Sequence, residues 1–172
     1  MDSGNIGFVL LCAAFVFVMT PGLAMFYGGL VRKKNVVNTM MTSIFIIGIG
    51  IVMWVLFGYS LSFAPSGNAF IGDFRWLGLE GVLLTEGYTD DASIPNMVFS
   101  AFQMMFAVIT PALITGAVAG RMKFKSIFVF TIFWSLIVYY PLAHMVWGQG
   151  GLLGADGIGA LDFAGGGVLH IS

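Results

Sequence analysis

The sequence predicts an all-α integral membrane protein with four complete transmembrane helices and the beginning of a fifth. Of the 172 residues, 59% are hydrophobic and only 9% are charged, whereas soluble domains carry about 25% charged residues. Four apolar runs are each long enough to cross the ~30 Å hydrocarbon core of a bilayer. The 24 glycines also fit, because glycine is more frequent in transmembrane helices than in soluble ones.

Charged residues lie almost entirely between the apolar runs and alternate in sign along the chain. Basic clusters occur at Arg32–Lys34 and Arg121–Lys125, and acidic residues occur in the N-terminal tail, in residues 65–93 and in residues 148–162. The positive-inside rule places both basic clusters in the cytoplasm. We therefore expect a multi-pass protein of the cell (plasma) membrane with its N-terminus outside. The net charge of -1 gives no reason to expect nucleic acid as a partner.

The first apolar run, residues 6–31, predicts a transmembrane helix that we expect Pro21 to interrupt. No basic n-region precedes it, so we interpret it as a mature helix and not as a signal peptide. Residues 36–64 predict the second helix. Its Trp54 and Tyr59 suit either the outer membrane interface or packing between helices, and for Trp54 we expect packing.

A polar segment, residues 65–93, separates the second helix from the third. It contains Gly67 among several glycines and Pro65, which is typical of turns and loops. Within it, residues 74–84 are weakly amphipathic and are a candidate for a short interfacial helix.

Two further transmembrane helices are predicted at residues 94–120 and 124–147. Pro95 falls in the first turn of the third helix, where a missing N–H costs little. Pro111 falls in its middle, where we expect a kink. Residues 148–161 contain six glycines in fourteen positions and predict a loop.

Asp162 begins the last apolar segment, which we expect to open the fifth helix. His170 lies eight residues later, about two helical turns or ~12 Å deeper and near the middle of the membrane. Ionisable residues are costly there and are functional candidates by default. Two interpretations of Asp162 stay open and are compatible: an N-cap for the N–H of Ala164 or Gly165, or a fixed negative charge at the outer mouth of a cation path. For His170 the alternative is a histidine satisfied within the core.

Several other side chains have a structural and a functional interpretation. Trp147 is either a tryptophan of the interfacial belt or a cation–π surface for a small cation. Phe102 and Phe106, at positions i and i+4, share one helix face beside Gln103, although pairs of this kind are common among 17 phenylalanines. For His144, near the outer end of its helix, we favour a structural role.

Several kinds of chemistry lack support in the sequence. The glycine runs do not fit G-x-G-x-x-G or a P-loop, so we expect no nucleotide cofactor. No His, Cys and carboxylate group has metal-ligand spacing, so we expect no metal. A membrane enzyme that uses Asp162 and His170 as an acid–base pair is conceivable, but no nucleophile accompanies them. We therefore expect a protein that is not an enzyme.

Four segments of the chain resemble ammonium transporters of the Amt/Mep/Rh family, and the Amt/Mep branch in particular. They are residues 20–35 (TPGLAMFYGGLVRKKN), 102–106 (FQMMF), 143–148 (AHMVWG) and 162–170 (DFAGGGVLH). One departure is Gly120 before Arg121, where relatives often carry Glu. It concerns packing at the cytoplasmic end and not the pore.

The resemblance implies eleven membrane helices in two inverted halves, with residues 1–172 as the N-terminal half, truncated in helix 5. It implies a homotrimer with one pore in each subunit, and a cytoplasmic regulatory partner of the PII type. Trp147 would correspond to the outer cation-recruiting tryptophan and Phe106 to a gate phenylalanine with Phe102 behind it. Asp162 would be the outer-mouth aspartate and His170 the first of two pore histidines.

The expected function is therefore the transport of ammonium or ammonia across a lipid bilayer, without a cofactor. Two alternatives stay open. The chain is an ammonium-sensing domain if a signalling module follows it, or it is an inactive fragment if nothing does.

Overall fold

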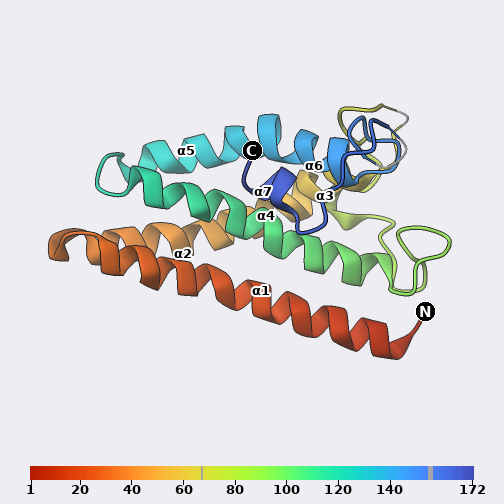
Figure 1. The fold of residues 1–172 in the computed structure, drawn as a ribbon, viewed down its shortest axis with the longest axis horizontal. Coiled ribbons are helices and arrows are strands. Elements are labelled where there is room, and N and C mark those ends of the chain that lie inside the picture. Colours follow the sequence, from red (N-terminus) through yellow and green to blue (C-terminus); the bar gives the residue numbers. More distant parts are fainter. Residues whose placement is uncertain (67, 155–156) are drawn as a thin grey trace. The chain divides into compact units, whose positions relative to one another are not determined.

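The structure of the chain is a computed structural model that describes residues 1–66, 68–154 and 157–172. Gly67 and Asp156, which the sequence assigns to loops, lie outside the described residues. Within the described part, the regular secondary structure is helical (Figure 1) apart from one isolated bridge between Gly87 and Pro95. The chain forms two compact units, each considered by itself: Met1–Ile51 with Val82–Thr131, and Val52–Gly81 with Ile132–Ser172.

Four helical spans in the described residues are long and apolar enough to cross a membrane. Their bounds are Ser3–Leu30, Lys33–Phe63, Asn96–Val118 and Phe124–Trp147. The four spans predicted from the sequence are therefore confirmed to within three residues at every end. The fourth span, Phe124–Trp147, begins and ends at the predicted residues.

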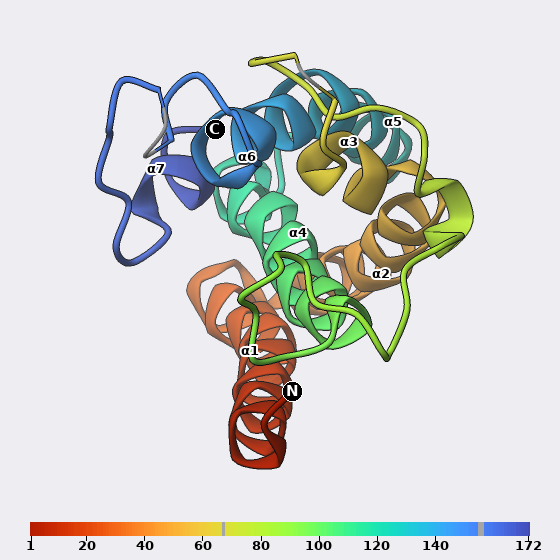
Figure 2. The same ribbon diagram turned by 90° about the vertical axis from the view of Figure 1, so that its right-hand side faces the viewer.

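In the first unit, α1 (Ser3–Leu30) packs mainly against α4 (Asn96–Val118), and both views show the two helices alongside each other (Figures 1 and 2). Gly116 makes the contact close, because a Cβ there would lie 2.5 Å from the Tyr27 ring. The Tyr27 hydroxyl donates a hydrogen bond to the Leu113 carbonyl at 3.0 Å. A small residue on one helix thus lets an aromatic ring of the other reach its backbone.

The interruption expected at Pro21 is wrong, because α1 continues through that residue. Proline removes one N–H from the helical ladder, and the turns on both sides keep their bonds and the packing on α4. Asp2 begins the helix as its N-cap and accepts the Asn5 N–H at 2.8 Å. In α4, Pro95 is the N-cap and Pro111 lies inside a helix that continues on both sides.

A small buried cluster joins the helices of the first unit. It contains Ile46 of α2 (Val36–Met53), Ala112 of α4 and Ile127 of α5 (Phe124–Trp134), with Leu23 and Val118 packed against it. Gly50 brings α2 close to α4, since a Cβ there would lie 3.0 Å from the Val108 side chain. The short helix η1 (Lys33–Asn35) precedes α2 and carries part of the first basic cluster.

Two π-helical segments, absent from the sequence-based prediction, interrupt the second and fourth spans. They are η2 (Trp54–Gly58), which leads into α3 (Tyr59–Phe63), and η4 (Ser135–Tyr139), which leads into α6 (Tyr140–Trp147). In the second unit the Tyr140 ring packs against Gly58, where a Cβ would lie 2.7 Å from it. Such π segments occur mostly as single wide turns within helices, often at functional sites.

The packing role expected for Trp54 is confirmed. Trp54 is 1% exposed and its ring centroid lies 6.0 Å from that of Tyr140. Tyr59 is also fully buried and stacks on Trp76 at 5.4 Å between centroids. Both aromatic residues therefore belong to the core of the second unit.

The interfacial helix considered for residues 74–84 is wrong. Only η3 (Leu77–Leu79), a three-residue 3-10 turn, forms there. Gly78 and Leu79 both have positive φ, 65° and 62°, and left-handed residues cannot continue a right-handed helix. The segment is instead tied to α3 through Ser60, whose hydroxyl donates to the Asp73 carbonyl at 2.7 Å and accepts the Trp76 N–H at 3.0 Å.

Candidate functional site

Trp147 and Asp162, two of the residues singled out from the sequence, are bonded to each other in the second unit. Trp147 is the last residue of α6, and its indole Nε1–H donates to the Asp162 Oδ2 at 3.1 Å. The other carboxylate oxygen, Oδ1, accepts the backbone N–H of Gly167 at 3.0 Å. The carboxylate thus connects the end of α6 to the start of the short helix α7 (Gly166–Leu169).

The structure corrects the interpretation of Asp162 as the first residue of a helix. α7 begins at Gly166, and its N-cap is Gly165 in a left-handed conformation, φ 76°. Asp162 therefore does not bond the N–H of Ala164 or Gly165 as expected. It reaches the N–H of Gly167 from four residues before the helix, so that its charge still faces the positive end of a helical turn.

The glycine at position 165 is required by the turn that shapes this site. Its positive φ is a conformation that residues with a Cβ rarely adopt. A Cβ at this position would lie 3.6 Å from the Trp147 ring, so the indole covers the turn. The turn, the ring and the carboxylate form one compact group, which we call the indole–carboxylate site (Trp147, Asp162, Gly165 and Gly167).

The loop after Trp147 uses its glycines to approach the end of α6. The Gly148 N–H bonds the His144 carbonyl at 2.9 Å, and the Leu153 and Gly154 N–H groups bond the Met145 carbonyl at 2.8 and 3.0 Å. A Cβ at Gly151 would lie only 2.3 Å from the His144 carbonyl oxygen. These bonds satisfy carbonyl groups that a helix leaves open at its C-terminus, which gives the glycine run a structural purpose.

His144 has the structural role that the sequence favoured. The side chain is fully buried, at 0% exposure. Its Nδ1 lies 3.1 Å from the Ser62 carbonyl oxygen and its Nε2 lies 2.9 Å from the Asn68 carbonyl oxygen. In either neutral tautomer one of these contacts is an N–H···O hydrogen bond. His144 therefore connects α6 to the chain that follows α3.

His170 follows a short helix and does not lie within a continuous one as the sequence predicts. It is the C-cap residue of α7 and its side chain is exposed in this chain. The segment from Asp162 to His170 is not a continuous helix, because only Gly166–Leu169 is helical. The expected separation of two helical turns is therefore wrong for this structure. Val168, in the same short helix, is fully buried and fixes α7 to the second unit.

Phe102 and Phe106 lie in the first unit and contact each other as their spacing predicts. Their ring centroids are 5.0 Å apart and the rings are nearly perpendicular, at 80°, a favourable arrangement for aromatic pairs. Both side chains are half-buried. Gln103 beside them has a buried Oε1 without a hydrogen-bond partner among the described residues.

The exposed segment of the second unit also carries an ion pair. Arg75 Nη2 lies 2.7 Å from Asp73 Oδ2, and Arg75 Nε donates to the same oxygen at 2.8 Å. The hydrogen bond from the Arg75 side chain holds the pKa of the Asp73 carboxyl below its usual value, and burial opposes the shift. Asp73 is thus an acidic residue with a fixed partner outside the membrane spans.

Comparison with known proteins identifies relatives along the whole chain. A sequence model of the Ammonium Transporter Family matches residues 7–172. The chain is 52% identical to the ammonium transporter of Bacillus subtilis (strain 168), covering 100% of this chain and 41% of that protein. It is 43% identical to the ammonium transporter of Aquifex aeolicus (strain VF5), covering 100% and 40%. The chain therefore spans about two fifths of the length of these curated relatives.

Two solved structures with the same fold are described differently, one as Mep2 and the other as a sensor. Saccharomyces cerevisiae Mep2 has a TM-score of 0.87 at 36% identity and matches 99% of this chain and 37% of its own. A structure described as a sensor Amt protein has a TM-score of 0.82 at 27% identity and matches 96% of this chain and 40% of its own.

These findings confirm the resemblance read from the four sequence segments. The four apolar spans agree with a multi-pass membrane protein, and the all-helical architecture agrees with the Mep2 fold. Both curated relatives described above are named as ammonium transporters. The chain belongs to the Ammonium Transporter Family.

Proposed function

We propose that the protein containing this chain transports ammonium or ammonia across the plasma membrane and is not an enzyme. Residues 1–172 would form the N-terminal half of its membrane domain, with the N-terminus outside and both basic clusters in the cytoplasm. The whole protein would act as a homotrimer in the lipid bilayer, with a cytoplasmic regulator of the PII type. The family match over residues 7–172 supports the substrate class.

The observation that carries this proposal is the bond between Trp147 and Asp162. A tryptophan ring attracts small cations through its face, and an adjacent carboxylate adds negative potential. The bond fixes the orientation of the indole ring, because Nε1–H is the only hydrogen-bond donor of the ring. The ring is then held at the end of a helix that the positive-inside rule directs outward.

The proposed mechanism separates charge from the transported molecule. A hydrated cation is costly to bring into an apolar pore, whereas neutral ammonia is not. Ammonium would be recruited at Trp147, with the potential of Asp162 in support. Phe106, with Phe102 behind it, would exclude water so that the ion gives up its proton. Ammonia would then pass His170, whose imidazole nitrogens can hydrogen-bond it or relay the proton.

A sensor is the alternative within the same fold, since one solved neighbour is described as a sensor. Transport is favoured because that neighbour is 27% identical, whereas the relatives named as ammonium transporters reach 52% and 43%. The two functions differ in an observable way: a transporter carries a sustained flux, and a sensor binds ammonium without one.

The recruitment step is tested by Trp147→Leu in the complete protein. Loss of the aromatic face should raise the half-saturating ammonium concentration about 5- to 30-fold, as expected for ~1–2 kcal/mol of cation–π attraction. The maximal rate should change less. Uptake measured over a range of ammonium concentrations separates the two parameters. An unchanged half-saturating concentration would exclude Trp147 from recruitment.

A further inference from the structure

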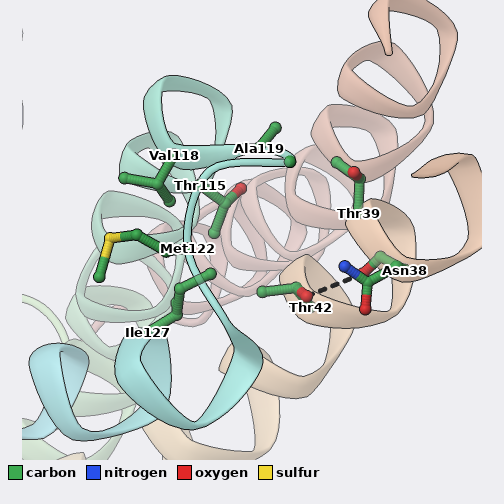
Figure 3. Close-up of a pocket in the computed structure, with 9 residues that line it drawn as sticks. Asn38, Thr39, Thr42, Thr115, Val118, Ala119, Met122 and Ile127 are labelled. Carbon is green, nitrogen blue, oxygen red and sulfur yellow. Dashed lines mark hydrogen bonds between the residues drawn. The ribbon is translucent and has the colours of Figure 1, made fainter. Parts of the chain in front are cut away.

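A second polar site lies in the first unit, away from the residues discussed so far. It is a small cleft, here called the threonine cleft, and Figure 3 shows its side chains. Those that matter here are Asn38, Thr39 and Thr42 of α2, Thr115 and Val118 of α4, and Ile127 of α5. The hydroxyl groups come from two helices and lie around one opening (Figure 3).

Most hydroxyl protons around the threonine cleft are already committed. Thr42 Oγ1 donates to the Asn38 carbonyl at 2.7 Å, and Thr115 Oγ1 donates to the Ala112 carbonyl at 2.7 Å. Ser43, next to the cleft, lies 3.0 Å from the Thr115 hydroxyl. Each hydroxyl oxygen has two lone pairs. The cleft therefore presents acceptors from Thr42 and Thr115.

Thr39 is the exception in this group. Its side chain is 4% exposed, and its Oγ1 has no hydrogen-bond partner among the described residues. A buried hydroxyl without a partner is unfavourable and rare in native proteins. It retains a proton to donate and lone pairs to accept. A ligand that accepts this proton and also donates to the oxygens of Thr42 and Thr115 must combine acceptor and donor capacity within a small volume.

The size of the cleft and the groups that line it narrow the choice of ligand. The cleft has a cavity volume of about 10 Å³, close to the minimum of ~10–15 Å³ that one water needs. Thr42 and Thr115 have used their hydroxyl protons, so both offer a ligand only acceptors. A neutral molecule of water size fits these conditions.

We propose that the threonine cleft binds one water molecule. The water accepts the Thr39 hydroxyl proton and donates to the hydroxyl oxygens of Thr42 and Thr115, so that it connects α2 with α4. A bound water of this kind usually makes about three hydrogen bonds. It extends the polar contact between the two helices that the Ser43 and Thr115 hydroxyls already make.

The first test is a structure of the complete protein at a resolution that shows ordered waters. We expect a single density peak at hydrogen-bond distance, about 2.6–3.2 Å, from Thr39 Oγ1 and within reach of Thr115. The peak should persist in Thr39→Ser and disappear in Thr39→Val. A wild-type map without a peak there, or with a side chain filling the cleft, would overturn the proposal.

Thermal unfolding supplies a second test. With water bound, Thr39→Val removes its hydrogen-bond partner and should lower the unfolding temperature by roughly 2–4 °C, and Thr39→Ser should lower it less. In a dry cleft the same change removes an unsatisfied hydroxyl, so an increase in unfolding temperature would contradict the proposal. Thr110→Val is the matched control: Thr110 is 2% exposed, but its hydroxyl bonds the Phe106 carbonyl within α4. It should leave the density peak in place.

Discussion

The two histidines of the second unit have opposite surroundings. His144 is fully buried and both ring nitrogens contact backbone carbonyl oxygens. His170, at the end of the short helix α7, is exposed. The first is committed to holding two parts of the chain together. The second makes no such contact within the described residues.

This difference shows how a polar residue in an apolar chain can be interpreted. Buried polar groups normally have partners supplied by the protein, and such a residue is explained by the fold itself. An ionisable residue of a membrane segment without that explanation is a candidate for function. Residue type alone does not separate the two cases, because both residues are histidines.

The largest effect on transport is expected from His170→Ala. If the imidazole relays protons or bonds ammonia, its loss should reduce ammonium flux by about 100-fold, at the lower end of what a positioned acid–base group contributes. Thermal unfolding of the variant serves as the control for folding. Flux and thermal unfolding are measured on the same preparation. Full flux with unchanged selectivity would remove His170 from the mechanism.

His144→Phe should show the opposite pattern. Phenylalanine keeps a ring but removes the imidazole N–H that bonds the Ser62 or the Asn68 carbonyl, which should cost about 2 kcal/mol. The expected result is a lower unfolding temperature and faster hydrogen exchange near residues 68–72. His144→Gln, which can still donate hydrogen bonds, should recover part of the loss. Equal stability of the Phe variant and the wild type would contradict a structural role.

Asp162→Asn tests the connection between α6 and α7. An amide retains one oxygen for the Trp147 or Gly167 N–H but loses the charge and the second acceptor. Since hydrogen bonds to a charged group are worth about 1.5–3 kcal/mol, we expect roughly 10-fold weaker uptake at low ammonium. The control is Asp73→Asn, which removes an exposed carboxylate paired with Arg75. Similar uptake by the two variants would argue against the site.

The smallest effect is expected from titration of Asp73. Its pKa is lowered in the folded state, chiefly by the Arg75 side chain. The resulting stability is therefore present above the unfolded pKa and is lost as the pH falls through the folded pKa. Because the pair is exposed, the effect should be below about 1 kcal/mol. NMR titration of the Asp73 carboxyl should show the lowered pKa, and Arg75→Gln should return it toward its ordinary value.

The transmembrane spans could be predicted because hydrophobic composition and the placement of charge determine them directly. The π-helical segments could not, because a helix that is apolar on all sides has no periodic pattern in which one extra residue would be visible. The glycine at position 58 was visible in the sequence, but its contact with Tyr140 joins residues that are far apart along the chain. Such pairing depends on how two helices pack.

The residues of the site were predictable by type, but their arrangement was not. Trp147 and Asp162 were both recognised, yet the bond between them spans a loop of fourteen residues whose path no local signal specifies. The start of α7 was placed four residues early, because an aspartate before an apolar run usually caps a helix. Here the left-handed turn at Gly165 delays the helix, and three consecutive glycines give no indication of which one turns.

The most direct test of transport is ammonium uptake into liposomes that contain the complete protein. We predict a flux that saturates with ammonium concentration, exceeds that of protein-free liposomes, and falls about 100-fold in His170→Ala while His144→Gln retains flux in proportion to its folded fraction. A flux equal to that of lipid alone, from protein that is folded and binds ammonium, would contradict transport and favour a sensor.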